Sequence, residues 1–325
     1  MRNRLSNLLV EACAKDPRRV VLSGDHGYAL FDALRKSHPS SFINVGVMEQ
    51  AMVGMSAGLA KSGARPIVYG LSAFVPIRVL EQIKMDVCHM GYPVIFLGDG
   101  AGLVYSTLGA SHQCGEDVAA LRPMPGMKIL TPADADELEA CFREALQTDG
   151  PCYIRIGKSD RPAVNVAKLA STAPRVLRKT TSDRPVLVTM GSMTAFGSSL
   201  AAAKNGGADA SEGGFDLGHI SVLRVKPIHA ELCEVLKTAK EIWVLEEHSR
   251  FGGLASAVAD AMLDAGLSIP RLRVWSLKDQ FVHSCGSYQH ALSEHQLSDE
   301  QVRKSFASAI AESASGKGPE GANRI

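Results

Sequence analysis

Hydrophobic positions in the first half of the chain form short apolar runs, which alternate with segments where apolar residues recur at helical spacing. The apolar runs predict strands at 20–23, 42–45, 66–69, 93–97, 128–130 and 152–156. The helical spacing predicts helices at about 3–14, 48–62, 76–90 and 133–147. Because strand and helix alternate repeatedly, we expect an α/β fold with a parallel sheet covered by helices on both faces.

The second half repeats this pattern after a polar interruption at 157–184. Strands are predicted at 186–189, 220–225, 242–245 and 272–276, and helices at about 194–204, 228–238, 252–265 and 298–312. We therefore expect a first domain at 1–160, a linker at 161–184, a smaller α/β domain at 185–312, and a mobile, glycine-rich tail at 313–325.

Composition is that of a soluble globular protein, with 325 residues, 46% hydrophobic and 21% charged. The net charge of +1 gives no basis for binding nucleic acid or an anionic membrane surface. No apolar run reaches the roughly 18 residues of a membrane helix, and the N-terminus resembles an amphipathic helix rather than a signal peptide. Seven scattered cysteines without a CxxC pair predict neither a disulfide framework nor a metal site, and favour a cytoplasmic location.

One candidate for chemistry is Glu49, in the segment Gly46-Val47-Met48-Glu49 between a predicted strand and a helix rich in small residues. Glu49 is expected near the helix N-terminus and at the carboxyl end of the strand, where open α/β sheets bind ligands. By itself, a carboxylate at this position is also explained by the helix dipole.

Three further side chains follow predicted strands of the same sheet: Asp25 in Asp25-His26-Gly27, Phe74, and His112 in a glycine-flanked segment. Each alone has a structural explanation, as a turn residue, a core aromatic and a loop histidine. Together with Glu49 they predict a ligand site at the carboxyl edge of the sheet, without specifying the reaction.

Two other motifs receive structural interpretations. Gly98-Asp99-Gly100 could begin a magnesium–diphosphate motif, but no Asn follows before Asn165 to complete it, so we interpret it as a turn. Glu246-Glu247-His248 in the second half is interpreted as a partly buried network at a domain interface, not as a catalytic group.

The segment 42–60 resembles the pyrimidine-binding domain of transketolases and deoxyxylulose-phosphate synthases. The similarity continues through 82–87, 109–113, 130–134 and 153–158, while 226–228 and 246–259 resemble the transketolase C-terminal domain. The resemblance lacks the front domain that binds diphosphate. It therefore implies the second subunit of a split transketolase, whose partner subunit carries the diphosphate and magnesium motif. An α2β2 heterotetramer containing a homodimer of this chain is expected.

In that family thiamine diphosphate is bound between two chains, with Mg²⁺ ligands supplied here by the partner. The resemblance implies that Glu49 hydrogen-bonds the aminopyrimidine ring, favouring the imino form that removes the thiazolium C2 proton, and a raised pKa of Glu49 would help. Phe74 would stack on the pyrimidine, and His112 would move protons near the reacting oxygens. Further cofactor contacts are expected from Asp25, Val47, Met48, Leu71 and Arg78.

The substrate contacts depart from the family pattern. Gly100 replaces a histidine, Leu108 an acid and Ala29 a serine, while Lys158 stands where an arginine often binds phosphate. His26, Gly100, Leu108 and Lys158 remain the candidate substrate residues. The resemblance therefore predicts transfer of a two-carbon ketol unit, with a modified sugar phosphate or a specialised-metabolite ketone as substrate. Two alternatives stay open: the β-subunit of a 2-oxoacid dehydrogenase or decarboxylase, and a non-catalytic binding subunit.

Overall fold

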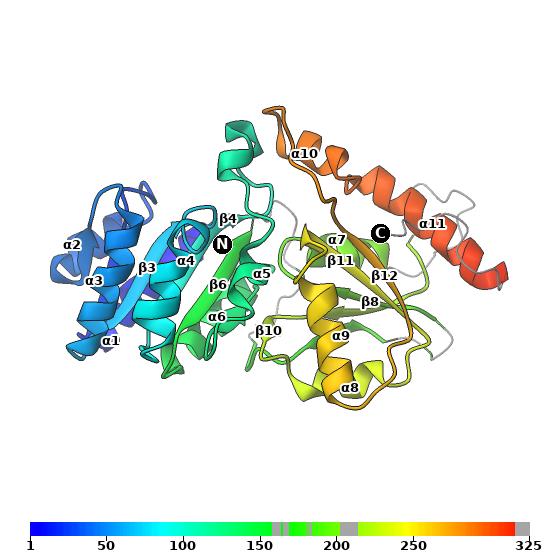
Figure 1. Ribbon diagram of the computed structural model, residues 1–325, viewed down its shortest axis with the longest axis horizontal. Coiled ribbons are helices and arrows are strands. Elements are labelled where there is room, and N and C mark those ends of the chain that lie inside the picture. Colours follow the sequence, from blue (N-terminus) through cyan, green and yellow to red (C-terminus); the bar gives the residue numbers. More distant parts are fainter. Residues whose placement is uncertain (158–163, 165–168, 180, 182–183, 202–213, 316–325) are drawn as a thin grey trace.

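The computed structural model describes residues 1–157, 164, 169–179, 181, 184–201 and 214–315. Two α/β domains lie beside each other, each built on its own sheet (Figure 1). The α/β prediction is confirmed. None of the helices in these described ranges combines the length and apolar character needed to cross a membrane.

The first sheet has seven strands in the order β10-β5-β6-β4-β3-β1-β2. Their bounds are β1 (Arg19–Ser23), β2 (Phe42–Asn44), β3 (Arg65–Leu71), β4 (Ile95–Ala101), β5 (Lys128–Leu130), β6 (Cys152–Gly157) and β10 (Arg224–Lys226). Neighbouring strands run parallel except for β10, which is antiparallel to β5. All six strands predicted in this half are present.

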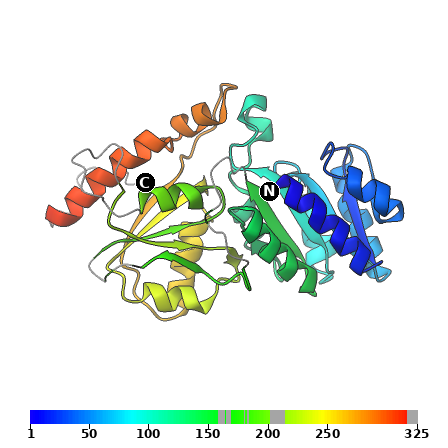
Figure 2. The same cartoon turned by 180° about the vertical axis from the view of Figure 1, so that it is seen from behind.

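Helices cover both faces of this sheet because consecutive strand residues point to opposite sides. Val21 and Ile67 pack under α1 (Arg2–Lys15), α2 (Asp32–Ser37) and α6 (Ala135–Gln147). Leu22 and Val68 face α3 (Glu49–Lys61), η3 (Ile83–Cys88) and α5 (Asp117–Leu121). Figure 2 shows α1 and α6 from the side that Figure 1 hides.

The second sheet has five strands in the order β12-β11-β8-β9-β7. Their bounds are β7 (Arg175–Arg178), β8 (Val186–Thr189), β9 (Gly218–Ser221), β11 (Glu241–Ser249) and β12 (Arg271–Leu277). On one face α7 (Met193–Leu200), α10 (Tyr288–Glu294) and α11 (Asp299–Ser315) form one core cluster with the sheet. The cluster on the other face includes α8 (Ala230–Leu236) and α9 (Leu254–Asp264).

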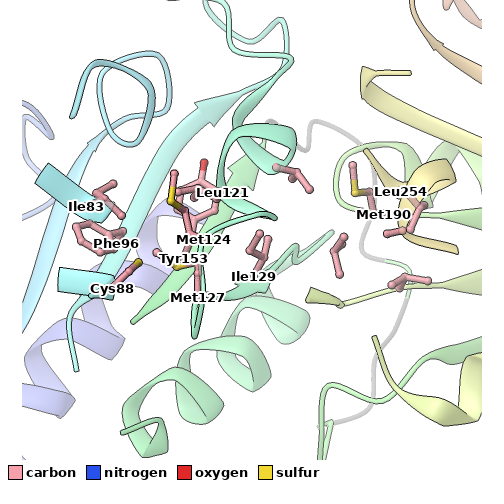
Figure 3. Packing of buried hydrophobic residues seen from close by; sticks show 14 of the residues in the cluster. Ile83, Cys88, Phe96, Leu121, Met124, Met127, Ile129, Tyr153, Met190 and Leu254 are labelled. Atoms are coloured by element: carbon pink, nitrogen blue, oxygen red, sulfur yellow. The ribbon is translucent and has the colours of Figure 1, made fainter. Parts of the chain in front are cut away.

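The apolar core is continuous between the domains. One buried cluster runs from Ile83 and Phe96 of the first domain to Met190 and Leu254 of the second (Figure 3). Burial of apolar surface across this junction stabilises one arrangement of the domains, at about 25 cal/mol per Å² removed from water. The second domain therefore lies close enough to influence the first.

Two sequence expectations about this junction are corrected. The predicted strand 220–225 is two strands, because the chain leaves β9 at Ser221 and re-enters the first sheet as β10. Thr131 fixes this crossing: its amide donates to the Leu223 carbonyl at 2.7 Å and its hydroxyl donates to the Val222 carbonyl at 2.9 Å. In addition, the stretch expected as a linker contains β7, which pairs with β9.

Local geometry also departs from the predictions. The helix expected at 76–90 is three short pieces: η2 (Ile77–Val79), α4 (Leu80–Gln82) and the π-helix η3. Short elements without a clear period were not predicted, namely α2, α10 and η1 (Pro39–Ser41). The last helix, α11, extends to Ser315, into the segment expected as a tail, and 316–325 lie outside the described residues.

Candidate active site

Glu49 is the first residue of α3 and is buried, with 3% of its surface exposed. Its two carboxylate oxygens face different partners. Oε1 lies 3.5 Å from His26 Nε2, and Oε2 accepts a hydrogen bond from Arg78 Nη1 at 3.2 Å. The helix N-terminus, a histidine and an arginine therefore surround one buried carboxylate, an arrangement that stabilises negative charge.

The pKa of Glu49 is lower than usual in this structure, which corrects the expectation of a raised value. Burial acts to raise the pKa, but the helix-terminal amide of Glu49, the His26 hydrogen bond and the nearby Arg78 charge outweigh it. Glu49 is thus held as a carboxylate while His26 and Arg78 remain its partners.

Phe74 joins this group from the turn after β3. Its ring centroid lies 5.7 Å from that of His26 and 5.2 Å from that of His112, which it meets edge-on. Arg78 covers the ring, with Cζ 4.0 Å from the centroid. The structure therefore brings together Glu49, His26, Phe74, Arg78 and His112 from four separate segments of the first domain.

Asp25 lies on the turn after β1, and its partner is Asn44. Asn44 Nδ2 donates to Asp25 Oδ1 at 3.1 Å, while Asn44 Oδ1 accepts from the Asp25 amide at 3.1 Å and the Gly46 amide at 3.0 Å. Asp25 has φ +63°, in the left-handed region. Asn44 thereby ties the His26 turn to the segment before Glu49, a role that the sequence analysis missed.

His112 lies on an excursion from the end of β4, residues 103–113, which we call the His112 loop. The loop contains η4 (Ser106–Leu108) and η5 (Ala110–His112). At its base, Gly102 and Cys114 exchange backbone hydrogen bonds of 2.7 and 2.8 Å. His112 Nδ1 lies 3.0 Å from Ser111 Oγ, and its ring reaches back to Phe74.

The remaining predicted cofactor residues form a rim around Glu49. Val47 is 67% exposed and Met48 is 53% exposed, although both are apolar and adjoin a buried carboxylate. Leu71 is half-buried at the end of β3. An exposed apolar rim around a charged centre is typical of a surface that another molecule covers.

The candidate substrate residues lie on the other side of this edge. Gly100 forms a bulge in β4 with φ +72°, so the strand continues through the motif that we expected to be a turn. Any Cβ on Gly100 would overlap the ring of Tyr105. Leu108 is 54% exposed, and Lys158 lies outside the described residues.

A cavity of about 340 Å³ lies beside Gly100. Its polar lining includes Arg2, Tyr69, Asp99 and Tyr105. Asp99 Oδ2 accepts hydrogen bonds from Tyr69 at 2.7 Å and from Tyr105 at 3.3 Å. Asp99 is therefore a hydrogen-bond acceptor in a pocket, not the turn residue that the sequence suggested.

Glu246, Glu247 and His248 lie on β11, buried at the junction with the first domain. Arg155 of β6 pairs with Asp117 at 3.0 Å and donates to the Glu247 carbonyl at 2.9 Å. Burial raises the pKa of Glu246 to about 7 and lowers that of His248 to about 4. The interpretation of this motif as a buried interface network is confirmed.

Comparison with known proteins gives the family. The transketolase pyrimidine-binding domain model matches residues 1–162, and the transketolase C-terminal domain model matches residues 175–302. One of the two subunits of the apulose-4-phosphate transketolase of Phocaeicola vulgatus is 30% identical over 89% of this chain and 90% of its own length. The 6-deoxy-6-sulfo-D-fructose transketolase subunit SqwH of a Clostridium species is 32% identical over 84% of each chain.

A solved structure supports the same assignment. It is described as a split gene transketolase, an inactive β4 tetramer, and it matches with a TM-score of 0.79 and 29% identity, covering 95% of this chain and 97% of that chain. The chain therefore belongs to the transketolase family, and over nearly its full length it corresponds to a subunit of split transketolases.

Proposed function

We propose that this chain is the pyrimidine-binding subunit of a split, thiamine-diphosphate-dependent enzyme that transfers a two-carbon ketol unit from a ketose to an aldose-type acceptor. The observation that carries the proposal is the convergence of Glu49, Phe74 and His112 at the carboxyl edge of one sheet. A buried carboxylate beside an aromatic face suits a flat, nitrogen-containing ring.

The position of Arg78 provides a test of whether an aminopyrimidine fits. Its guanidinium is a planar N–H donor that covers Phe74 and bonds to Glu49. An aminopyrimidine is also planar and carries N–H donors, so it could make both contacts once Arg78 moved aside. The side chain of Arg78 is 46% exposed, so it has room to move toward solvent.

When bound, thiamine diphosphate supplies the carbanion chemistry that amino-acid side chains lack. Glu49 would hold the pyrimidine at a ring nitrogen, and loss of the Arg78 contact would let burial raise the pKa of Glu49. Phe74 would fix the plane of the ring. His112 would hold or release a proton at the substrate oxygens.

The substrate pocket is proposed to be the cavity beside Gly100. Tyr105 fills the space that a side chain at position 100 would need, and Leu108 presents an apolar surface instead of an acid. Asp99 offers hydrogen-bond acceptors to the cavity. These features favour a modified sugar phosphate or a specialised ketone over the usual pentose phosphates.

The proposed partner is a front subunit that carries the diphosphate and Mg²⁺ motif, in an α2β2 assembly with two copies of this chain. Support comes from the exposed apolar side chains of Val47, Met48 and Met55 around the opening of the Glu49 site. The described residues contain no cluster of three His, Cys, Asp or Glu side chains suited to a metal ion, so the Mg²⁺ ligands are assigned to the partner.

The test is hydrogen–deuterium exchange at C2 of thiamine diphosphate, with Mg²⁺ and this chain, in the presence and absence of the front subunit. We expect rapid exchange only with both subunits, and its loss in Glu49→Gln. No acceleration by a verified complex would contradict the proposal and support a non-catalytic subunit. Product analysis then separates ketol transfer from CO₂ release, which would indicate a 2-oxoacid dehydrogenase or decarboxylase.

A further inference from the structure

The His112 loop is attached to the second domain at its base. Glu247 of β11 accepts a hydrogen bond at Oε1 from the backbone amide of Leu103, at 2.7 Å. Gly102 allows this approach, because a Cβ at that position would overlap the Glu247 carboxylate. Gly102 also has φ +78°, which favours glycine.

The second carboxylate oxygen of Glu247 fixes the glutamate itself. Glu247 Oε2 accepts from Ser192 Oγ at 2.6 Å and from the Tyr288 hydroxyl at 2.5 Å. Glu247 is 1% exposed, so its charge depends on these donors for stabilisation. One buried carboxylate therefore connects the base of the His112 loop to the residue before α7 and to the first residue of α10.

Other contacts extend this attachment along the loop. The Gly286 amide donates to the Ser106 carbonyl at 3.4 Å, and the Ser249 amide donates to the Gly115 carbonyl at 2.6 Å. Cys285 Sγ would lie 3.1 Å from a Cβ on Gly109. Figure 1 shows the loop standing beside α10, above the edge of the first sheet.

We infer that Glu247 is a positioning residue for His112: it anchors the His112 loop to the second domain and thereby sets the distance of His112 from Phe74 and Glu49. This inference rests on the function proposed above. His112 Nδ1 bonds only to the adjacent Ser111 among the described residues, so the backbone of the loop must fix its position. The second domain thus contributes to the site without touching it.

The first experiment needs no cofactor. Amide hydrogen exchange is measured in the full chain for wild type and for Glu247→Ala. Glu246→Ala is the matched control, because Glu246 is the neighbouring buried carboxylate and bonds to the amides of Leu254 and Ala255 in α9 instead of the loop. We expect exchange at 103–113 to rise on the order of tenfold in Glu247→Ala alone, the effect of losing a bond to a charged group.

The second experiment uses the complete complex with the front subunit. Glu247→Ala should leave C2 exchange unchanged, because that step depends on Glu49. It should lower ketol transfer by on the order of 10²-fold, the cost of misplacing a catalytic group by about 1 Å. A merely structural defect would lower both rates together.

A milder variant guards against misfolding. Tyr288→Phe removes one donor to Glu247 and should produce the same split between the two rates, with a smaller effect. Unchanged loop exchange in Glu247→Ala, with a normal wild-type complex, would overturn the inference alone. A wild-type complex without C2 exchange would instead overturn the proposed function, and with it the role assigned to His112.

Discussion

Arg78 lies over the ring of Phe74, with its Cζ 4.0 Å from the ring centroid. From there the guanidinium also donates to Glu49 at 3.2 Å, so one cation covers both proposed pyrimidine contacts. The free chain is therefore stable with its buried carboxylate neutralised by its own arginine. The same contact lowers the pKa of Glu49, which makes Arg78 a determinant of the protonation state of the site.

Arg78→Ala is predicted to raise the pKa of Glu49 in the isolated chain. The substitution removes a neighbouring positive charge and a hydrogen bond, while burial, which raises the pKa, remains. The ¹³C carboxyl shift of Glu49, followed as a function of pH by NMR, measures the change. Arg78→Lys retains the charge and should give a smaller shift. An unchanged pKa in Arg78→Ala would show that the guanidinium contact is unimportant in solution.

Glu49→Gln should preserve the fold and abolish activity. Glutamine keeps the size of the side chain, but it cannot exchange a proton with the pyrimidine ring. C2 exchange in the complete complex is expected to fall on the order of 10³-fold, as for loss of an acid–base group. Chemical denaturation of the variant checks the fold, and near-wild-type exchange rates would contradict the role of Glu49.

Gly100→His is predicted to destabilise the first domain. The new side chain would require φ +72° and would collide with Tyr105, and overpacking of this kind costs about 1–3 kcal/mol. Thermal unfolding of the variant measures the loss. Combining Gly100→His with Tyr105→Gly should recover part of the stability, since the ring that causes the collision is gone. No recovery would mean that backbone strain alone explains the effect.

The double variant also tests the substrate proposal. If Tyr105 excludes the family histidine, then Gly100→His with Tyr105→Gly should increase activity with xylulose 5-phosphate and ribose 5-phosphate relative to wild type. Steady-state kcat/KM for this pair gives the measurement. High wild-type efficiency with these pentose phosphates would contradict the proposal of a modified substrate.

His248 is predicted to make the chain less stable below neutral pH. Its folded-state pKa of about 4 lies below the usual 6.5, so the unfolded state binds more protons between these values. Stability should therefore fall as pH decreases from 6.5 to 4, by at most about 1.4 kcal/mol per pH unit from this group. Glu246 acts oppositely, because its raised pKa keeps a proton in the fold between pH 4.5 and about 7.

Denaturation at several pH values tests this linkage. His248→Gln should reduce the slope of stability against pH in this window by about one proton. Glu246→Gln should change the slope in the opposite direction and serves as the control. Identical slopes in wild type and His248→Gln would show that His248 does not titrate on unfolding.

Much of the fold could be predicted from local patterns. The alternation of apolar runs and helical spacing identified all six strands of the first half and α1, α3 and α6. Strand crossing was not predictable, because Val222 and Leu223 have the same apolar character on either side of the change from β9 to β10. The choice of sheet depends on hydrogen bonds from Thr131, which is distant in sequence.

The sequence by itself determined where the chemistry lies. Glu49, Phe74 and His112 each follow a predicted strand, and the carboxyl ends of parallel strands share one edge of the sheet, so their proximity follows from topology. Only the tertiary structure decided the electrostatics of the site. Arg78 and His26 set the pKa of Glu49, and Glu247 holds the His112 loop from another domain. Such contacts join residues far apart in the chain, and their distances depend on packing that no local pattern records.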